Sequence, residues 1–321
     1  MVASGQMPDV AVDAKKSIHI AYGNGDSLMY IQSRDGGKTF SLPLLVEILP
    51  GLAASHTRGP QIAIASAGVC ILACNSMGDI FSFRLNNSKW QKTGRVNDVD
   101  TVAKENLIAL GGDGDHLAAA WLDLRGNKKN KIVGTHSEDG GVSWSRNEIW
   151  YASPDSTVCE CCKPSVAVKG HDVFVMFRNF IDGNRDMYLL HSTDGGLSFG
   201  KASRLGEGNW QLDGCPMDGG AVVISNGVAQ TVWRRQATVF SCTEGHEEVA
   251  LGEGKGSTLE IVNGKTVYAW SENGKIILID SKGTKRSIGS GMLPVIKSLG
   301  DDQIICIWED DKKITSAVVD L

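Results

Sequence analysis

The stretch Ser137-Glu-Asp-Gly-Gly-Val-Ser-Trp144 decides the fold, because the chain repeats its pattern at two other places. The other two octets are Ser33-Arg-Asp-Gly-Gly-Lys-Thr-Phe40 and Ser192-Thr-Asp-Gly-Gly-Leu-Ser-Phe199. An aspartate that accepts backbone N–H bonds, two glycines at positive φ and an aromatic ring packed between sheets together make a rigid hairpin turn. The repeat therefore predicts three equivalent turns in which the structural residues are Asp35, Asp139 and Asp194.

A longer unit surrounds the octets, with an inner strand, a Gly- or Asp-rich turn, a strand rich in β-branched and aromatic residues, and a third strand. The predicted inner strands are Pro8-Asp-Val-Ala, Pro60-Gln-Ile-Ala, Asn106-Leu-Ile-Ala, Pro164-Ser-Val-Ala, Gly220-Ala-Val-Val, Ser257-Thr-Leu-Glu and Pro294-Val-Ile-Lys. The predicted second strands are Ile18-His-Ile-Ala-Tyr, Val69-Cys-Ile-Leu-Ala, Leu117-Ala-Ala-Ala-Trp, Val173-Phe-Val-Met-Phe, Val228-Ala-Gln-Thr-Val-Trp, Thr266-Val-Tyr-Ala-Trp and Ile304-Ile-Cys-Ile-Trp. Each set has one member for each of seven units.

These units predict an all-β propeller of four-stranded antiparallel blades, with seven blades favoured and six as the alternative. The last unit reaches Leu321 after three strands, so we expect a strand near Met1 to complete the last blade. Closing the ring in this way removes exposed sheet edges. No linker divides the chain, and we predict a single propeller domain over residues 1–321.

The octets resemble the Asp box of the bacterial neuraminidase (BNR) repeat, which occurs in sialidases and in several other propeller proteins. The resemblance implies the propeller fold, and it implies a structural rather than a catalytic role for the octets. Arg58-Gly-Pro60 resembles the Arg-Ile-Pro motif of sialidases, which implies carboxylate binding by Arg58. In this chain the motif follows the first octet, whereas in sialidases it precedes the first Asp box. The paired Tyr and Glu that a sialidase needs do not emerge from the sequence.

Composition narrows the class of partner. Lys and Arg number 32 against 37 Asp and Glu, so a nucleic-acid surface has no support from charge. No apolar run approaches the roughly 20 residues of a membrane helix. Met1-Val2-Ala3-Ser4-Gly5 lacks the features of a signal peptide. We expect a periplasmic or extracellular protein whose export signal is absent from this chain.

The chemically unusual residues fall in loops at the end of the ring opposite the octets. Several guanidinium groups around a central cavity suit a carboxylate, sulfate or phosphate. An alternative interpretation is salt bridges between blade loops, and for Trp210 the choice is between stacking on a sugar and filling a blade junction. The predicted ligand-binding residues are His56, Arg58, Arg125, Arg178, Arg185, Trp210, Arg234 and Arg235.

The eight cysteines divide into two groups of four. Cys70, Cys74, Cys242 and Cys306 lie inside strand patterns and are predicted to be small buried hydrophobic residues. The other four lie in two loops, where they fit two disulfides between the loops, a soft-metal site for copper or zinc with Met217 or His56 as a further ligand, or free thiols. The predicted metal ligands are Cys159, Cys161, Cys162 and Cys215.

Acidic residues on the same loops supply candidates for glycoside hydrolysis, which requires a pair of carboxyl groups. The predicted catalytic residues are Asp123, Asp213 and Asp218, with turn formation as the structural alternative.

Three functions are open at this point. The first is an exported sialidase-like protein that binds a carbohydrate or an anionic small molecule, with glycoside hydrolysis as a further option. The second is a non-catalytic propeller that binds copper or zinc through the cysteine loops. The third is a scaffold that recognises another protein. Fold is a weaker guide to function than the residues of the site.

Overall fold

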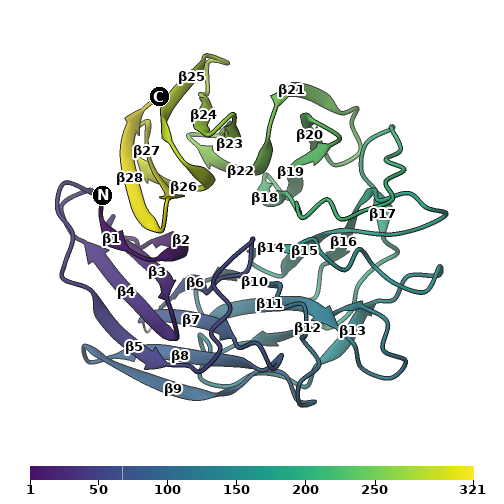
Figure 1. The fold of residues 1–321 in the computed structure, drawn as a ribbon, viewed down its shortest axis with the longest axis horizontal. Helices are drawn as coiled ribbons and strands as arrows, with labels where there is room; N and C mark the ends of the chain where they lie inside the picture. The colour runs from purple at the N-terminus through teal and green to yellow at the C-terminus, as the bar shows by residue number, and fades with distance from the viewer. Residues whose placement is uncertain (67) are drawn as a thin grey trace.

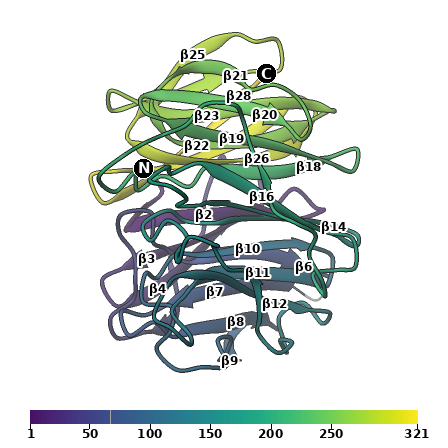
Figure 2. The ribbon, with the colours of Figure 1, turned by 90° about the vertical axis from the view of Figure 1, so that its right-hand side faces the viewer.

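The computed structural model describes residues 1–66 and 68–321, which form seven four-stranded antiparallel sheets arranged in a ring (Figure 1). Seen from its rim, the ring has blades V to VII above blades I to III (Figure 2). The prediction of an all-β propeller is confirmed, with seven blades rather than six. The described residues contain no α-helix, and hence no helix long and apolar enough to cross a membrane.

The first four blades carry the long loops. Blade I comprises β2 (Gln6–Val12), β3 (Ile18–Asn24), β4 (Ser27–Ser33) and β5 (Leu44–Ile48). Blade II comprises β6 (Gln61–Ala65), β7 (Gly68–Cys74), β8 (Ile80–Asn86) and β9 (Lys89–Arg95). Blade III comprises β10 (Ile108–Asp113), β11 (His116–Asp123), β12 (Lys131–Ser137) and β13 (Glu148–Tyr151). Blade IV comprises β14 (Ser165–Lys169), β15 (Asp172–Arg178), β16 (Met187–Ser192) and β17 (Ser203–Arg204).

The last three blades have short connections. Blade V comprises β18 (Ala221–Ser225), β19 (Val228–Arg235), β20 (Thr238–Thr243) and β21 (Val249–Glu253). Blade VI comprises β22 (Lys255–Val262), β23 (Lys265–Glu272), β24 (Lys275–Ile279) and β25 (Lys285–Ser290). Blade VII comprises β26 (Met292–Gly300), β27 (Gln303–Asp310), β28 (Lys313–Asp320) and, from the other end of the chain, β1 (Ala3–Ser4).

The N-terminal strand closes the ring, as predicted. Strand β1 pairs antiparallel with β28, with Ala3 opposite Ile314. The Val2 N–H donates to the Ile314 carbonyl at 2.7 Å, and the Gly5 N–H donates to the Lys312 carbonyl at 2.8 Å. Because this strand covers the outer edge of blade VII, both ends of the chain are held in one sheet.

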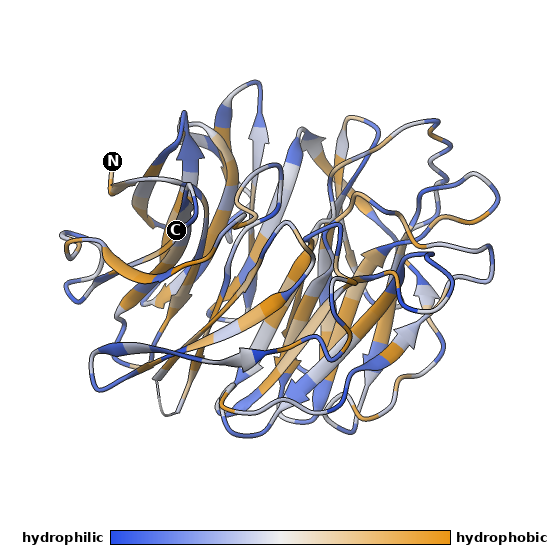
Figure 3. Cartoon of the chain, turned by 60° about the horizontal axis from the view of Figure 1, so that its bottom comes forward, coloured by the Kyte–Doolittle hydropathy of each residue, from blue (hydrophilic) through white to orange (hydrophobic). Residues whose placement is uncertain are grey.

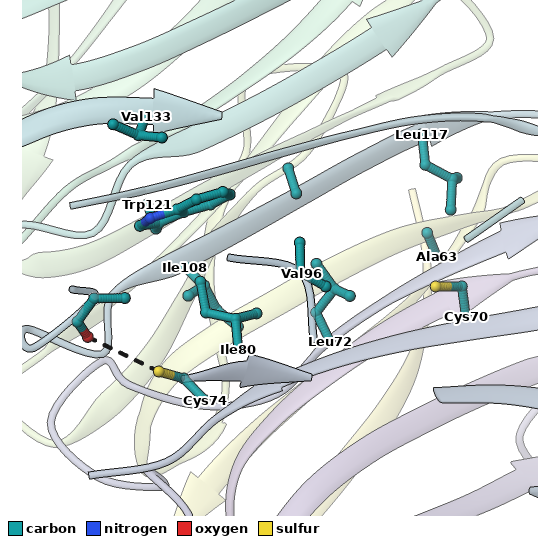
Figure 4. Packing of buried hydrophobic residues seen from close by; sticks show 12 residues of the cluster. Ala63, Cys70, Leu72, Cys74, Ile80, Val96, Ile108, Leu117, Trp121 and Val133 are labelled. Carbon is teal, nitrogen blue, oxygen red and sulfur yellow. Dashed lines mark hydrogen bonds between the residues drawn. The ribbon is translucent and has the colours of Figure 1, made fainter. Parts of the chain in front are cut away.

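Side-chain packing between neighbouring blades holds the ring together. Each of the seven blade interfaces contains one cluster of buried apolar side chains. Between blades II and III, Trp121 lies near Ile108 and Ile80, with Cys70 and Cys74 in the same cluster (Figure 4). The four strand cysteines are buried free thiols, as predicted. Hydrophobic residues follow the strands while hydrophilic ones gather in the loops (Figure 3).

The three octets form similar turns, each joining the third strand of a blade to the fourth. Asp139 accepts hydrogen bonds from the Ser137 hydroxyl at 2.8 Å and from the Val142 and Ser143 N–H groups at 3.0 and 2.9 Å. Its neighbours Gly140 and Gly141 have φ of 66° and 88°, values that favour glycine. Asp35 and Asp194 accept the corresponding bonds in blades I and IV.

These turns make the stability of the ring depend on pH. Hydrogen bonds from Thr39 lower the pKa of Asp35 to about 2, and hydrogen bonds from Ser198 do the same for Asp194. The pKa of an aspartate in the unfolded chain is about 3.9. This stabilisation is therefore present above about pH 4 and is lost as the pH falls towards about 2. We expect the urea midpoint to fall less over this range when both residues are changed to Asn. An identical acid profile in the double variant would contradict this account.

Candidate functional site

Connections of very different length leave the two ends of the ring unequal. The octet turns lie at one end, and the other end, here called the loop face, carries the links from second to third strands and from blade to blade. On blades I to IV the long links span residues 49–60, 96–107, 124–130, 152–164, 179–186 and 205–220, whereas the β3–β4 and β7–β8 links span only 25–26 and 75–79. On blades V to VII they shrink to tight turns such as Gln236–Ala237 and Asn273–Gly274. The loop face is therefore built up on one side and low on the other.

A cavity of about 230 Å³ lies at the centre of the ring and is lined by all seven inner strands. Residues of the loop face also line it, namely Thr57, Gly59, Lys163, Pro164, Asp218 and Gly219. Because these residues belong to links between blades, the cavity opens towards the loop face. This is a usual place for ligands in rigid ring-shaped scaffolds.

Two lysines face this cavity in different electrostatic states. Lys297 forms an ion pair with Glu260 at 3.2 Å, which raises the pKa of Lys297. Lys163 makes no hydrogen bond or ion pair with any residue that the structure describes. Burial lowers the pKa of Lys163, and attraction to Asp9 acts in the opposite direction. Lys163 thus offers a cationic group that has no protein partner within the described chain.

Arg178, at the end of β15, is 2% exposed and binds three backbone carbonyls. Its guanidinium donates to the carbonyls of Asp218 at 3.1 and 3.2 Å, Arg185 at 2.7 Å and Arg234 at 2.8 Å. These carbonyls come from three separate segments of the loop face. The structure therefore uses Arg178 as a bracket between segments and turns its guanidinium away from solvent.

Arg234, Trp210 and Arg185 pack around this bracket. Two guanidinium groups lie over the Trp210 ring, with Arg178 Cζ at 5.0 Å and Arg234 Cζ at 5.1 Å from its centre. Arg234 also donates to Asp218 at 2.9 Å. Arg185 stacks on Phe180 at 4.6 Å and donates to the Leu212 carbonyl at 3.2 Å. Trp210 is buried, so it fills the junction between loops rather than facing solvent.

The other predicted ligand-binding residues lie on other segments and are also engaged. Arg58 donates to the Glu105 carbonyl at 2.7 Å and to the His56 carbonyl at 3.2 Å. Arg235 donates two hydrogen bonds to the Glu248 carboxylate, one of them at 2.7 Å. The His56 side chain is exposed. The structure thus does not bring the six arginines into one open ring of ligands, because carboxylates and carbonyls of the protein already bind them.

The three predicted catalytic aspartates stand in unlike surroundings. Asp123 is buried, accepts from Trp121 Nε1 at 2.8 Å and pairs with Arg125 at 2.9 Å. Asp218 is buried and accepts from Arg234 and from the Gly256 N–H at 3.0 Å. Asp213 is exposed. Their catalytic role stays a prediction, and the geometry gives two of them a structural task.

The four loop cysteines come together beside the Arg178 bracket. Cys161 and Cys215 form a disulfide that joins the 152–164 link to the 205–220 link. Cys159 and Cys162 are free thiols with sulfurs 3.4 Å apart, and the sulfur of Cys159 lies 3.8 Å from that of Cys161. Of the three arrangements that the sequence leaves open, two disulfides between the loops is not the one observed, because the second loop contains a single cysteine and forms one bridge, while Cys159 and Cys162 stay free.

The two free thiols have opposite acidities. The hydrogen bond to the Cys162 thiol, together with the charges of Arg178 and Arg185, lowers the pKa of Cys159. Burial raises the pKa of Cys162. Arg185 Nη1 donates to the Cys159 sulfur at 3.3 Å, so a negative charge on that sulfur has a direct cationic partner.

Lys163 is the residue of this site that sequence reasoning missed. It directly precedes Pro164 at the entrance to an inner strand, between the cysteine loop and the central cavity. That position was the available signal, because residues that enter inner strands face the axis of the ring.

The Arg178 bracket predicts a large effect on stability. Arg178→Met removes the charged donor of three backbone carbonyls, and we expect the free energy of unfolding to fall by about 3 kcal/mol or more in urea titrations. Arg146→Gln is the control, because Arg146 is exposed; a change within about 0.5 kcal/mol is expected there. Equal effects of the two substitutions would contradict the bracket.

Comparison with known proteins gives relatives in fold. No family model matches the chain, and no curated protein matches it. An ulvan lyase bound to -[GlcA(1-4)Rha3S]-, described as a new family of polysaccharide lyase, is similar with a TM-score of 0.61 and 11% identity over 99% of this chain and 94% of its own. A second structure of ulvan lyase has a TM-score of 0.59 at 11% identity, covering 99% and 96%. A protein of unknown function from Dyadobacter fermentans has a TM-score of 0.55 at 13% identity, covering 99% and 94%. At these identities the likeness shows the fold.

Proposed function

We propose that this protein is a sialidase-like Asp-box propeller whose loop face binds an anionic saccharide at the mouth of the central cavity. The observation that carries the proposal is Lys163, a cationic side chain that lines the cavity and has no partner among the described residues. A carboxylate or sulfate of the ligand supplies the missing partner. The three octets support the Asp-box assignment.

The fold relatives guide the choice of saccharide. The similar ulvan lyase is bound to a repeat that contains a uronate and a sulfate ester. Both groups are anions of the kind that an ammonium group binds. A saccharide also suits the uneven loop face, because a chain can lie across the low side of blades V to VII while the raised loops of blades I to IV flank it.

Binding accounts for the site better than hydrolysis. A glycosidase needs two carboxyl groups that face the substrate. Here Asp123 and Asp218 are buried against arginines, and Asp213 alone is exposed. We therefore assign the loop face a binding role and leave the acids to hold the loops.

The proposed compartment is the periplasm or the cell exterior. The Cys161–Cys215 disulfide supports an oxidising environment, in which such bonds persist.

The test compares two lysines of one blade. Lys163 enters β14 at the loop face, and Lys169 ends the same strand at the opposite end, where it is exposed and pairs with Asp113 at 3.2 Å. We expect Lys163→Met to weaken binding of an oligosaccharide of glucuronate and sulfated rhamnose by about tenfold or more in calorimetry, because it removes one charged hydrogen bond. Lys169→Met is expected to bind like the parent protein.

Two further measurements test this proposal. A neutral oligosaccharide of equal length is expected to bind far more weakly, and chromatography of the ligand after incubation is expected to return it uncut. Loss of affinity in both lysine variants, or none in either, would remove Lys163 from the site. Release of shorter products would replace binding with catalysis.

A further inference from the structure

An eighth buried cluster stands apart from the seven at the blade interfaces, and it consists only of cysteines. Its members are Cys159, Cys161 and Cys162, which are 0%, 8% and 1% exposed. Their sulfur atoms all lie within 4.8 Å of one another. Packing alone does not require three adjacent sulfurs at one point, since any small apolar side chain fills such a space. The arrangement therefore calls for a chemical role.

The sulfur separations match those around a shared metal ion. A metal–thiolate bond is about 2.3 Å long, which places the sulfurs of a trigonal or tetrahedral site about 3.8–4.0 Å apart. The Cys159 sulfur lies 3.8 Å from that of Cys161 and 3.4 Å from that of Cys162. The sulfurs therefore lie close to the positions of a three-sulfur site, with every pair of them within 4.8 Å.

The surrounding charges suit such a site. Three thiolates and one monovalent ion carry a net charge of about −2, which buried surroundings do not tolerate without nearby cations. Arg185 donates to the Cys159 sulfur at 3.3 Å. The Cys159 N–H donates to the carbonyl of Arg178, so the Arg178 bracket positions the backbone of the cluster. Arg185 thereby offsets part of the negative charge on the sulfurs, and Arg178 orients the backbone that carries them.

The disulfide decides when the third sulfur is available. Cys161 cannot ligate a metal as a thiolate while it is bonded to Cys215. Cys215 is exposed, so a reductant reaches this bond from solvent. Cys159 and Cys162 are free thiols while this disulfide is present.

We propose that the three sulfurs form a Cu(I) site that opens when a small dithiol reduces the Cys161–Cys215 bond. The dithiol gives two electrons and two protons, the disulfide becomes two thiols, and the dithiol becomes its own disulfide. One Cu(I) then binds the sulfurs of Cys159, Cys161 and Cys162, and their remaining protons pass to solvent. The site does not rest on saccharide binding.

Copper(I) fits better than zinc. Thiolates are soft ligands that favour Cu(I), whereas structural zinc almost always takes four protein ligands in a tetrahedron. Three of the sulfurs come from one buried turn, while the fourth, from Cys215, lies on an exposed loop. The cluster thus supplies three ligands on its own.

The experiment offers Cu(I) as its bicinchoninate complex, without oxygen, and measures transfer from the chelator by absorbance. We expect the oxidised protein to take up no Cu(I), and the protein reduced by dithiothreitol and then desalted to take up one ion. Cys159→Ser and Cys162→Ser are expected to lose this uptake. Cys242→Ser, which removes a buried thiol outside the cluster, is the matched control and is expected to retain it.

Cys215→Ser separates the proposal from its alternatives, because it frees the Cys161 thiol without any reductant. We expect this variant to bind one Cu(I) without prior reduction, which also guards against variants that merely fail to fold. A four-thiolate zinc site predicts the opposite, namely that Cys215→Ser loses its metal. Uptake by the oxidised parent, uptake by Cys159→Ser, or no uptake by reduced parent and Cys215→Ser alike would each overturn the proposal.

Discussion

The loop face depends on one buried guanidinium group. Arg178 satisfies carbonyls of Asp218, Arg185 and Arg234, and its own carbonyl accepts the N–H of Cys159. A buried arginine is tolerated only when its donors are matched, so these segments have little freedom to move apart. The mouth of the cavity and the sulfur cluster are both positioned by this one residue.

The packing of the ring supplies stability that offsets the cost of burying Arg178. Seven interfaces bury apolar side chains, and the pairing of β1 with β28 leaves no open edge at the junction of the two termini. The loops add buried side chains such as Leu52, Ala103 and Val158 to these clusters. The same loops also hold polar and charged side chains whose burial is set by hydrogen bonds rather than by apolar contact.

Much of the fold could be predicted from the sequence, since a repeated octet and the alternation of strands report local geometry. Pro8-Asp-Val-Ala and Pro294-Val-Ile-Lys both lie in inner strands, and each proline falls within a shift of the strand register, where its missing N–H is not needed. The site was harder to predict. Nothing near Arg234 in the sequence indicates that Asp218 binds it, because that contact depends on how two loops meet in space.

The cysteines show the same limit. The order of strands and loops places four of them at one end of the ring, but the pairing of Cys161 with Cys215 depends on how the 152–164 and 205–220 links meet in space. The contact of Cys159 with Arg185 likewise joins two separate loops. Lys163 was overlooked because an isolated lysine has no sequence pattern. Its importance comes only from the cavity that seven distant strands enclose.

We infer that the Arg178 bracket and the Arg185 contact hold the sulfurs of Cys159, Cys161 and Cys162 in position to act together. X-ray absorption at the copper edge of the reduced, Cu(I)-loaded protein tests it most directly. We expect the copper ion to have three sulfur neighbours at about 2.3 Å, the usual length of a metal–thiolate bond. A shell that contains nitrogen or oxygen, or one that changes when Cys215 is replaced by Ser, would contradict it.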